Sequence, residues 1–290
     1  MISSDIIQTL KYSDHFGFPL TLDEIHQRLI SSKSCSLERV SRALGLMSAK
    51  HQIQQTGNFY YLPGHSSLVT RRLARAKTSL PQLARAKTIS SRLSHLPGVL
   101  AIYLTGSLAM SNSGSHADID FMIITYPNRL WTTRILLTLY TELLGLRRRP
   151  HSNNSSGKIC LNLYLTPDTY ELPLNKRSLY TAYELIQAIP LYDPHDTRSA
   201  LFSANSWIKN YLPNFPLSAP TGSDPEGSAQ PRQYRLRGGS DPIGTLIESI
   251  CYHLQLAYMR GKLTREYITR DSAFFHPNDP GSKVLSKLRV

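Results

Sequence analysis

The spacing of apolar residues over 1–65 predicts a compact helical module closed by a hairpin. Apolar side chains recur every three or four residues, as one face of a helix requires, in the segments SSDIIQTLKYS, TLDEIHQRLI and SLERVSRALGLMSAK. In the third segment the apolar stripe consists of Leu37, Val40, Leu44 and Met47. The next segment, HQIQQTGNFYYLPG, has the pattern of two short strands around a Thr-Gly-Asn turn.

Residues 66–98 are predicted to form a basic helical connector. The hexapeptide LARAKT occurs in it twice, at 73–78 and 83–88, with Pro81 between the copies. Proline lacks a backbone donor and clashes with the preceding turn, so we expect Pro81 to kink or split the helix. Two copies of six residues are too few for a solenoid and indicate a local duplication or a coincidence.

From residue 99 onward, strand and helix patterns alternate. VLAIYLT, IDFMIIT and KICLNLYLT are typical of strands, and NRLWTTRILLTLYTELLGL and KRSLYTAYELIQAIP of helices. This alternation over 99–200 predicts a layered domain of the α/β (α+β) class.

The rest of the chain divides into three parts. We expect a helix over 201–212. Residues 213–242 are rich in Pro, Gly and Ser and nearly free of large apolar side chains, which is typical of a flexible linker. Over 243–290 helical periodicity returns, with Ile247, Ile250, Leu254 and Tyr258 on one face, and this predicts a C-terminal helical region.

Composition narrows the class of protein. The longest apolar stretch, ILLTLYTELLGL, is too short to span a bilayer and contains Glu142, while Asp5 lies where a signal peptide would be apolar. The three cysteines, Cys35, Cys160 and Cys251, are odd in number and widely spaced, which fits neither a disulfide framework nor a zinc motif. We therefore expect a globular cytoplasmic protein that does not enter a membrane.

Charge points to an anionic partner. The chain has 33 Lys and Arg against 20 Asp and Glu, a formal net charge of +13, and no acidic residue lies between Glu38 and Asp118. Such a basic run favours nucleic acid, a nucleoside triphosphate or both, and a merely solvated basic face is an equally ordinary explanation.

Two carboxylates stand in an otherwise apolar strand in LTGSLAMSNSGSHADIDFMIIT, residues 104–125. The alternation of a pleated strand places Asp118 and Asp120 on one face and Ile119 on the other. Paired carboxylates repel each other unless a cation neutralises them, and hard oxygen ligands suit Mg²⁺ or Mn²⁺. The alternative is a strand end whose aspartates meet water or cap a turn.

A Gly-Ser pair precedes the aspartates by ten residues. Gly106 ends the strand VLAIYLT, where the absence of a side chain lets a phosphate approach the backbone, and Ser107 offers a hydroxyl and an amide at the start of a short helix. Phosphates at this turn would face a metal held by the aspartates, as phosphoryl and nucleotidyl transfer require.

This combination of strand, Gly106-Ser107, ten residues, Asp118-x-Asp120 and strand resembles the nucleotidyltransferase superfamily typified by DNA polymerase beta, and most closely its minimal nucleotidyltransferases. Together LTGSLAM, DIDFMIIT, NRLWTTR, KICLNLYL and LYTAYEL resemble a group of prokaryotic members with an N-terminal winged helix. The resemblance implies a mixed sheet with helices, a metal on Asp118 and Asp120, and a nucleoside triphosphate on Gly106 and Ser107.

Members of this superfamily usually supply a third carboxylate from a later strand, and this chain departs from that pattern. The polar-face positions of KICLNLYLT are Lys158, Cys160, Asn162 and Tyr164, so we expect neutral Asn162 opposite the aspartates. Three outcomes stay open: catalysis with one metal and Asn162 as an orienting residue, a substitute carboxylate such as Asp168 or Glu184, or a nucleotide-binding protein that no longer reacts.

Further cations are candidates for the triphosphate. Arg134 on the helix after the aspartate strand could reach it, with Trp131 stacking on a base or packing in the core. Lys158 could neutralise phosphate charge or only extend along the sheet edge. The arginines at 147–149 end a helix, where cations suit the helix dipole.

The N-terminal module resembles, in topology alone, the winged-helix DNA-binding fold, whose third helix enters the major groove. Its exposed cations would be Arg39, Arg42 and Lys50. Winged helices also bind proteins or brace a neighbouring domain, so DNA contact is one alternative among these.

The leading hypothesis is a Mg²⁺-dependent nucleotidyltransferase that passes a nucleoside monophosphate to a hydroxyl of RNA, protein or a small molecule. Its alternative is a catalytically weak, nucleotide-sensing DNA-binding regulator or an antitoxin-like protein. The sequence predicts no oligomeric state.

Overall fold

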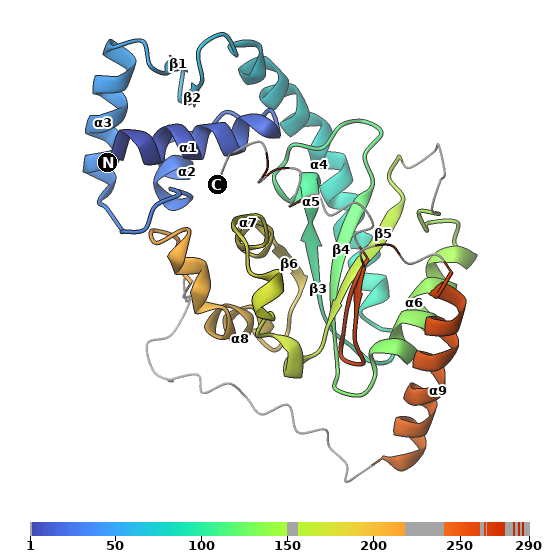
Figure 1. The fold of residues 1–290 in the computed structure, drawn as a ribbon. Helices are drawn as coiled ribbons and strands as arrows, with labels where there is room; N and C mark the ends of the chain where they lie inside the picture. The colour runs from blue at the N-terminus through green and yellow to red at the C-terminus, as the bar shows by residue number, and fades with distance from the viewer. Residues whose placement is uncertain are drawn as a thin grey trace.

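The computed structural model describes residues 2–149, 156–217, 241–261, 264, 266–275, 281, 284 and 286. In this part of the chain a six-stranded mixed sheet lies between two layers of helices, and a smaller two-stranded sheet belongs to the N-terminal module (Figure 1). The predicted α+β class is confirmed.

The N-terminal module has the predicted element order. Its elements are α1 (Ile2–His15), α2 (Leu22–Gln27), α3 (Leu37–Ala49), β1 (Gln54–Thr56) and β2 (Phe59–Tyr61). Thr21 and Glu24 form a capping box that starts α2, because each side chain accepts from the backbone of the other. The predicted apolar stripe of α3 is wrong at one position. Val40, Leu44 and Met47 are buried, but Leu37 is 39% exposed.

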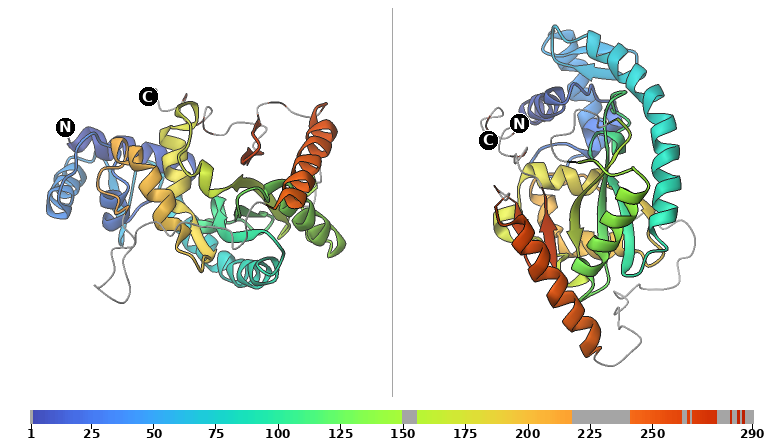
Figure 2. Two further views of the ribbon diagram at one scale, coloured as in Figure 1. Left: turned by 90° about the horizontal axis from the view of Figure 1, so that it is seen from below. Right: turned by 90° about the vertical axis from the view of Figure 1, so that its right-hand side faces the viewer.

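A single helix, α4 (Ser67–Leu93), connects the module to the central sheet (Figure 2). It continues through Pro81, so of the two expected outcomes, a kink or a split, the split is wrong, and the kink stays a prediction. Proline removes one hydrogen bond of the helix. The buried Val69 on one side of Pro81 and the buried Ile89 and Leu93 on the other anchor both halves by apolar contact.

The central sheet has the strand order β6-β3-β4-β5-β8-β7. Its strands are β3 (Val99–Thr105), β4 (Ile119–Thr125), β5 (Ile159–Leu165), β6 (Ile189–Tyr192), β7 (Tyr267–Ile268) and β8 (Ser272–Phe274). Among these described strands, β4 and β5 are the one pair that is parallel. Since β3 and β4 are antiparallel and join Thr105 to Asp120, the end of the first strand meets the beginning of the second.

The two faces of the sheet bury different cores. Along β4, Met122 and Ile124 pack with α7 (Leu179–Gln187), α8 (Thr197–Ala204) and the 3₁₀ helix η3 (Ser206–Asn210), and regular alternation puts Asp120 on this side, which we call the site face. Phe121 and Ile123 point to the opposite side, which we call the α9 face. That face is covered by α4, α6 (Leu130–Leu143) and α9 (Pro242–Met259).

Two expected boundaries shift. Helix α8 begins at Thr197, so a boundary at residue 200 cuts through it, and the helix expected over 201–212 divides into the end of α8 and η3. Of the expected linker, residues 218–240 lie outside the described residues. Asn214, at its start, belongs to the fold, because its side chain accepts from the Cys35 amide at 2.9 Å and donates to the His26 carbonyl at 2.9 Å.

The C-terminal region was expected to be helical, but it also contains β7 and β8, which extend the central sheet. The apolar stripe on α9 also faces outward: Ile250 is 49%, Leu254 63% and Tyr258 71% exposed. Instead the helix packs on α6 through its opposite side, which carries the buried Glu248. Among the described residues, no helix combines the length and apolar character needed to cross a membrane.

Candidate functional site

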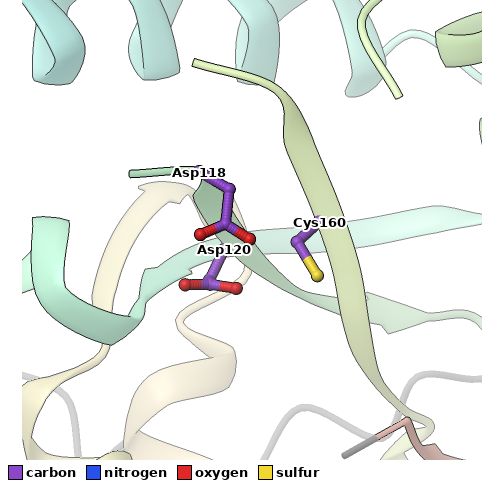
Figure 3. Close-up of side chains that lie close together, drawn as sticks. All are labelled: Asp118, Asp120 and Cys160. Atoms are coloured by element: carbon purple, nitrogen blue, oxygen red, sulfur yellow. The ribbon is translucent and has the colours of Figure 1, made fainter. Parts of the chain in front are cut away.

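The paired aspartates lie where β3 ends and β4 begins. Asp118 directly precedes β4, Asp120 is its second residue, and Cys160 is the residue paired with Asp120 on the neighbouring strand β5. One carboxylate oxygen from each aspartate and the sulfur of Cys160 all lie within 4.8 Å of one another (Figure 3). The expectation that both acids share one side of the strand is confirmed.

Gly106 brings the end of β3 against the second aspartate. Its φ is +67°, a conformation that side chains disfavour, and a Cβ built on it would clash with Oδ2 of Asp120. Any larger residue would displace that carboxylate. The expected proximity of the Gly-Ser turn to the aspartates is therefore also confirmed.

The electrostatics of the pair favour a bound cation. The pKa of Asp120 is raised to about 7, mainly by burial and then by the charge of Asp118, while Arg148 opposes the rise. Burial likewise raises the pKa of the Cys160 thiol to about 12. A divalent cation between these groups would offset the repulsion and favour the ionised forms.

Arg148 is a site residue that the sequence did not reveal. It was expected at a helix end, but α6 ends at Leu143. The backbone of Arg148 instead donates to the Ile159 carbonyl at the start of β5, and its Nη1 lies 2.5 Å from Oδ2 of Asp118 and 3.9 Å from the Cys160 sulfur. No sequence pattern marks this contact, because it depends on how the chain returns to the sheet.

Asn162 lies beside Asp120 as predicted, at a break in strand register. Its Nδ2 donates to Oδ1 of Asp120 at 3.1 Å, while its Oδ1 is buried and has no hydrogen-bond partner among the described residues. Phe121 pairs with Leu161 and Met122 with Leu163, so Asn162 is the extra residue of a β-bulge. The bulge reverses the alternation, and Tyr164 therefore packs in the core of the α9 face, contrary to expectation.

A cavity of about 450 Å³ opens beside these groups. One wall consists of Gly106, Ser107 and Asp120, and Glu184 of α7 adds a second carboxylate. The N-terminal module and α4 supply the other walls, through the aromatic residues and arginines Tyr12, Phe16, Phe18, Arg28 and Arg75. A cavity of this size and mixed polarity suits a small-molecule ligand.

Other predicted residues lie away from the cavity. Arg134 is on the α9 face, where its guanidinium donates to Gln255 and lies over the rings of Trp131 and Phe275. Lys158 donates to the Gly145 carbonyl. Asp168 is exposed in a 3₁₀ turn, η1 (Pro167–Thr169), beyond the far end of β5. None of the three lines the cavity.

Arg39, Arg42 and Lys50 are exposed along α3 and its C-terminal end, as the prediction of a nucleic-acid contact requires. Trp131 is fully buried, which favours its core alternative.

The donor set fits a divalent cation. Asp118 and Asp120 supply the hard oxygen atoms that Mg²⁺ and Mn²⁺ prefer. Asn162, whose Nδ2 contacts Asp120, also carries a neutral oxygen, Oδ1, that has no partner among the described residues. Cys160 adds a softer sulfur that favours Mn²⁺, Zn²⁺ or Cd²⁺ over Mg²⁺.

Comparison of the chain with protein-family models, with curated proteins and with solved structures gives no match.

Proposed function

We propose that this protein is a divalent-metal-dependent nucleotidyltransferase that moves a nucleoside monophosphate from a nucleoside triphosphate to a hydroxyl acceptor. The observation that carries the proposal is the close approach of Gly106 to Asp120, which lies beside Asp118 and, with Gly106, lines a cavity of about 450 Å³. Asp118 and Asp120 hold the metal, and Gly106 and Ser107 bind the phosphates. Mg²⁺ or Mn²⁺ neutralises phosphate charge when it is bound.

The reaction is an in-line displacement at the α-phosphorus. A bond forms between the acceptor oxygen and this phosphorus, and the bond from it to the oxygen that bridges the α- and β-phosphates breaks. Pyrophosphate leaves with that electron pair. The acceptor is an RNA end, a protein side chain or a small alcohol, and the basic run over 39–117 favours RNA.

The acceptor hydroxyl must lose its proton to a base. Among the described residues, two carboxylates line the cavity, Asp120 and Glu184. Oε1 of Glu184 accepts a hydrogen bond from the Tyr180 hydroxyl at 3.1 Å, which fixes its orientation. We assign Glu184 the role of base, since Asp168 lies outside the cavity and Asn162 cannot take up a proton.

A transfer assay tests the proposal. The wild type is incubated with Mg²⁺ or Mn²⁺, each of the four α-³²P-labelled ribonucleoside triphosphates, and total RNA or cell protein as acceptor. We expect label transfer, with a loss of at least about 100-fold in Asp118→Asn and Asp120→Asn. The matched control is Asp168→Asn, which makes the same change at an exposed carboxylate outside the cavity. Equal labelling by all four proteins would overturn the proposal.

The exposed cations of α3 favour a second candidate function, that of a nucleotide-sensing DNA-binding regulator. Arg39, Arg42 and Lys50 are free to contact phosphates on the face of α3 opposite its buried stripe. The affinity for duplex DNA should fall steeply as the salt concentration rises. The double variant Arg39→Ala, Arg42→Ala should bind more weakly, and its salt dependence should correspond to about two fewer phosphate contacts. Duplex binding that these changes leave unaltered would exclude α3 as the reading helix.

A further inference from the structure

The cavity joins two parts of the chain that are distant in sequence. Gly106, Ser107 and Asp120 come from the sheet, whereas Tyr12 and Phe16 belong to or directly follow α1 and Arg75 belongs to α4. The N-terminal module is docked on this side, since the Asn112 side chain donates to the Phe16 carbonyl at 3.1 Å and Tyr183 of α7 donates to the Arg28 carbonyl at 2.8 Å. The module therefore forms part of the cavity itself.

Arg75 is held next to the Gly-Ser turn. Its Nη1 donates to Oδ1 of Asn112 at 3.2 Å, and the backbone amide of Asn112 donates to the Ser107 carbonyl at 2.9 Å. These two hydrogen bonds tie the guanidinium to the short helix α5 (Gly106–Ala109) and to the residues that follow it. Because a guanidinium has five N–H donors, the contact with Asn112 leaves most of them for a ligand.

The charge of Arg75 has no acidic partner within the described part of the chain. The neighbouring arginines differ: Arg72 pairs with Glu24 at 2.7 Å, and Arg28 lies 3.9 Å from the same carboxylate. Arg75 is half-buried, so part of its hydration is lost without an ion pair to offset the loss. A cation in this position favours an anion in the cavity.

The repeated hexapeptide provides an internal comparison. Arg75 and Arg85 occupy the same position in the two LARAKT copies, but ten residues do not make a whole number of helical turns, so the copies face different sides of α4. Arg85 is exposed, and its guanidinium lies near Gly157 instead of the cavity. Only the first copy can contact a ligand beside Asp120.

We propose that Arg75 binds the β- and γ-phosphates of the nucleoside triphosphate, so that the N-terminal module and α4 complete the nucleotide site. This inference rests on the proposed transferase function. The guanidinium fork matches two phosphate oxygens at once and stabilises the charge of the pyrophosphate that leaves. Arg75 has the phosphate-binding role that was predicted for Arg134 and Lys158, which lie elsewhere.

Calorimetric binding of non-hydrolysable α,β-methylene triphosphates, each of the four bases in turn, tests this role in the full chain with Mn²⁺. We expect Arg75→Ala to raise the Kd at least about tenfold for the triphosphate and less than about twofold for the matching monophosphate. Arg85→Ala, the matched control, should change neither value. Arg75→Lys keeps the charge without the fork and should give an intermediate Kd, which also covers the case in which the alanine variant fails to fold.

Each contrary result has a separate meaning. Triphosphate binding to Arg75→Ala or Arg75→Lys as tight as to the wild type overturns the role of Arg75 and leaves the transferase proposal standing. An equal loss for mono- and triphosphate places Arg75 away from the distal phosphates and also overturns it. A wild type that binds none of the four triphosphates overturns the nucleotide site as a whole, together with the transferase proposal.

Discussion

The two faces of the central sheet both enclose charged and amide side chains, but these groups are paired to different extents. On the α9 face, Glu248 is 1% exposed and accepts from the backbone amides of Trp131 and Thr132 at 2.6 and 2.9 Å, so it caps the start of α6. Arg134 on the same face meets Gln255, Met259 and two aromatic rings. These groups have their partners within the protein.

On the site face the pairing is incomplete. Asp120 lies against a second carboxylate, Oδ1 of Asn162 is buried without a hydrogen-bond partner, and Arg75 has no acidic partner among the described residues. Buried polar groups are normally satisfied in folded proteins, because leaving them unpaired costs free energy. Under the proposed function, the incompletely paired charged and amide groups of the site face bind the ligand, whereas the paired groups of the α9 face stabilise the fold.

The largest expected effect is on the α9 face. Glu248→Ala leaves two backbone amides at the start of α6 without acceptors, and should lower the free energy of unfolding by about 3 kcal/mol. Urea unfolding measures this. Glu248→Gln keeps one acceptor oxygen and should lose roughly half as much, with metal binding unchanged. A Glu248→Ala protein as stable as the wild type would remove the contrast between the faces.

The second prediction tests whether Cys160 on the site face is a metal ligand. Thiolate binds soft cations, so Cys160→Ser should weaken Cd²⁺ binding by about 10- to 100-fold and Mg²⁺ binding by less than about threefold. Competition titrations measure both affinities, and loss of the sulfur-to-cobalt charge-transfer band of the Co²⁺ form reports the sulfur ligand directly. Cys251→Ser is the control at a cysteine outside the metal group. Unchanged Cd²⁺ affinity and an unchanged Co²⁺ spectrum would exclude Cys160 as a ligand.

Asp120 should make the metal-free protein less stable as pH rises. Its folded pKa is about 7 against 3.8 for a model aspartate, so the folded protein retains a proton that the unfolded chain has released. The contribution of this retained proton to the free energy of unfolding is fully present below about pH 4 and is lost as pH rises toward about 7. In EDTA, the stability of Asp120→Asn relative to the wild type should therefore rise with pH across this range, because the amide has no proton to release.

Thermal unfolding of both proteins at a series of pH values measures this difference. Saturating Mn²⁺ should reverse it, because the metal stabilises only the wild type. A constant gap between the two proteins from about pH 4 to about pH 8 would contradict the raised pKa.

The smallest effect is expected at Arg134. Arg134→Met replaces a half-buried cation by an apolar side chain of similar length, and such exchanges are often neutral, so the free energy of unfolding should change by no more than about 1 kcal/mol. The Kd for a triphosphate should stay within about twofold of the wild-type value. A tenfold rise in Kd would instead restore Arg134 as a nucleotide ligand, as first predicted from the sequence.

Local patterns predicted much of the fold and the centre of the site. The hairpin around the Thr-Gly-Asn turn, the strand alternation around Asp120 and the Gly106 turn each depend on neighbours within a few residues, and all three appear in the structure. The outward stripe of α9 shows the limit of this approach, since periodicity finds an apolar face without telling whether it is covered.

The sequence by itself determined that two carboxylates share one side of a strand and that a glycine turn precedes them, because the pleat and the backbone of glycine are properties of the chain. Only the tertiary structure decided which other side chains lie beside them. Arg148 contacts Asp118, and Cys160 pairs with Asp120 on the neighbouring strand. Arg75, from the first of two identical hexapeptides, lines the cavity, whereas Arg134 lies on the opposite face of the sheet. These choices depend on strand register, on one bulge and on the rotation of α4, and none of them is encoded by the spacing of neighbouring residues.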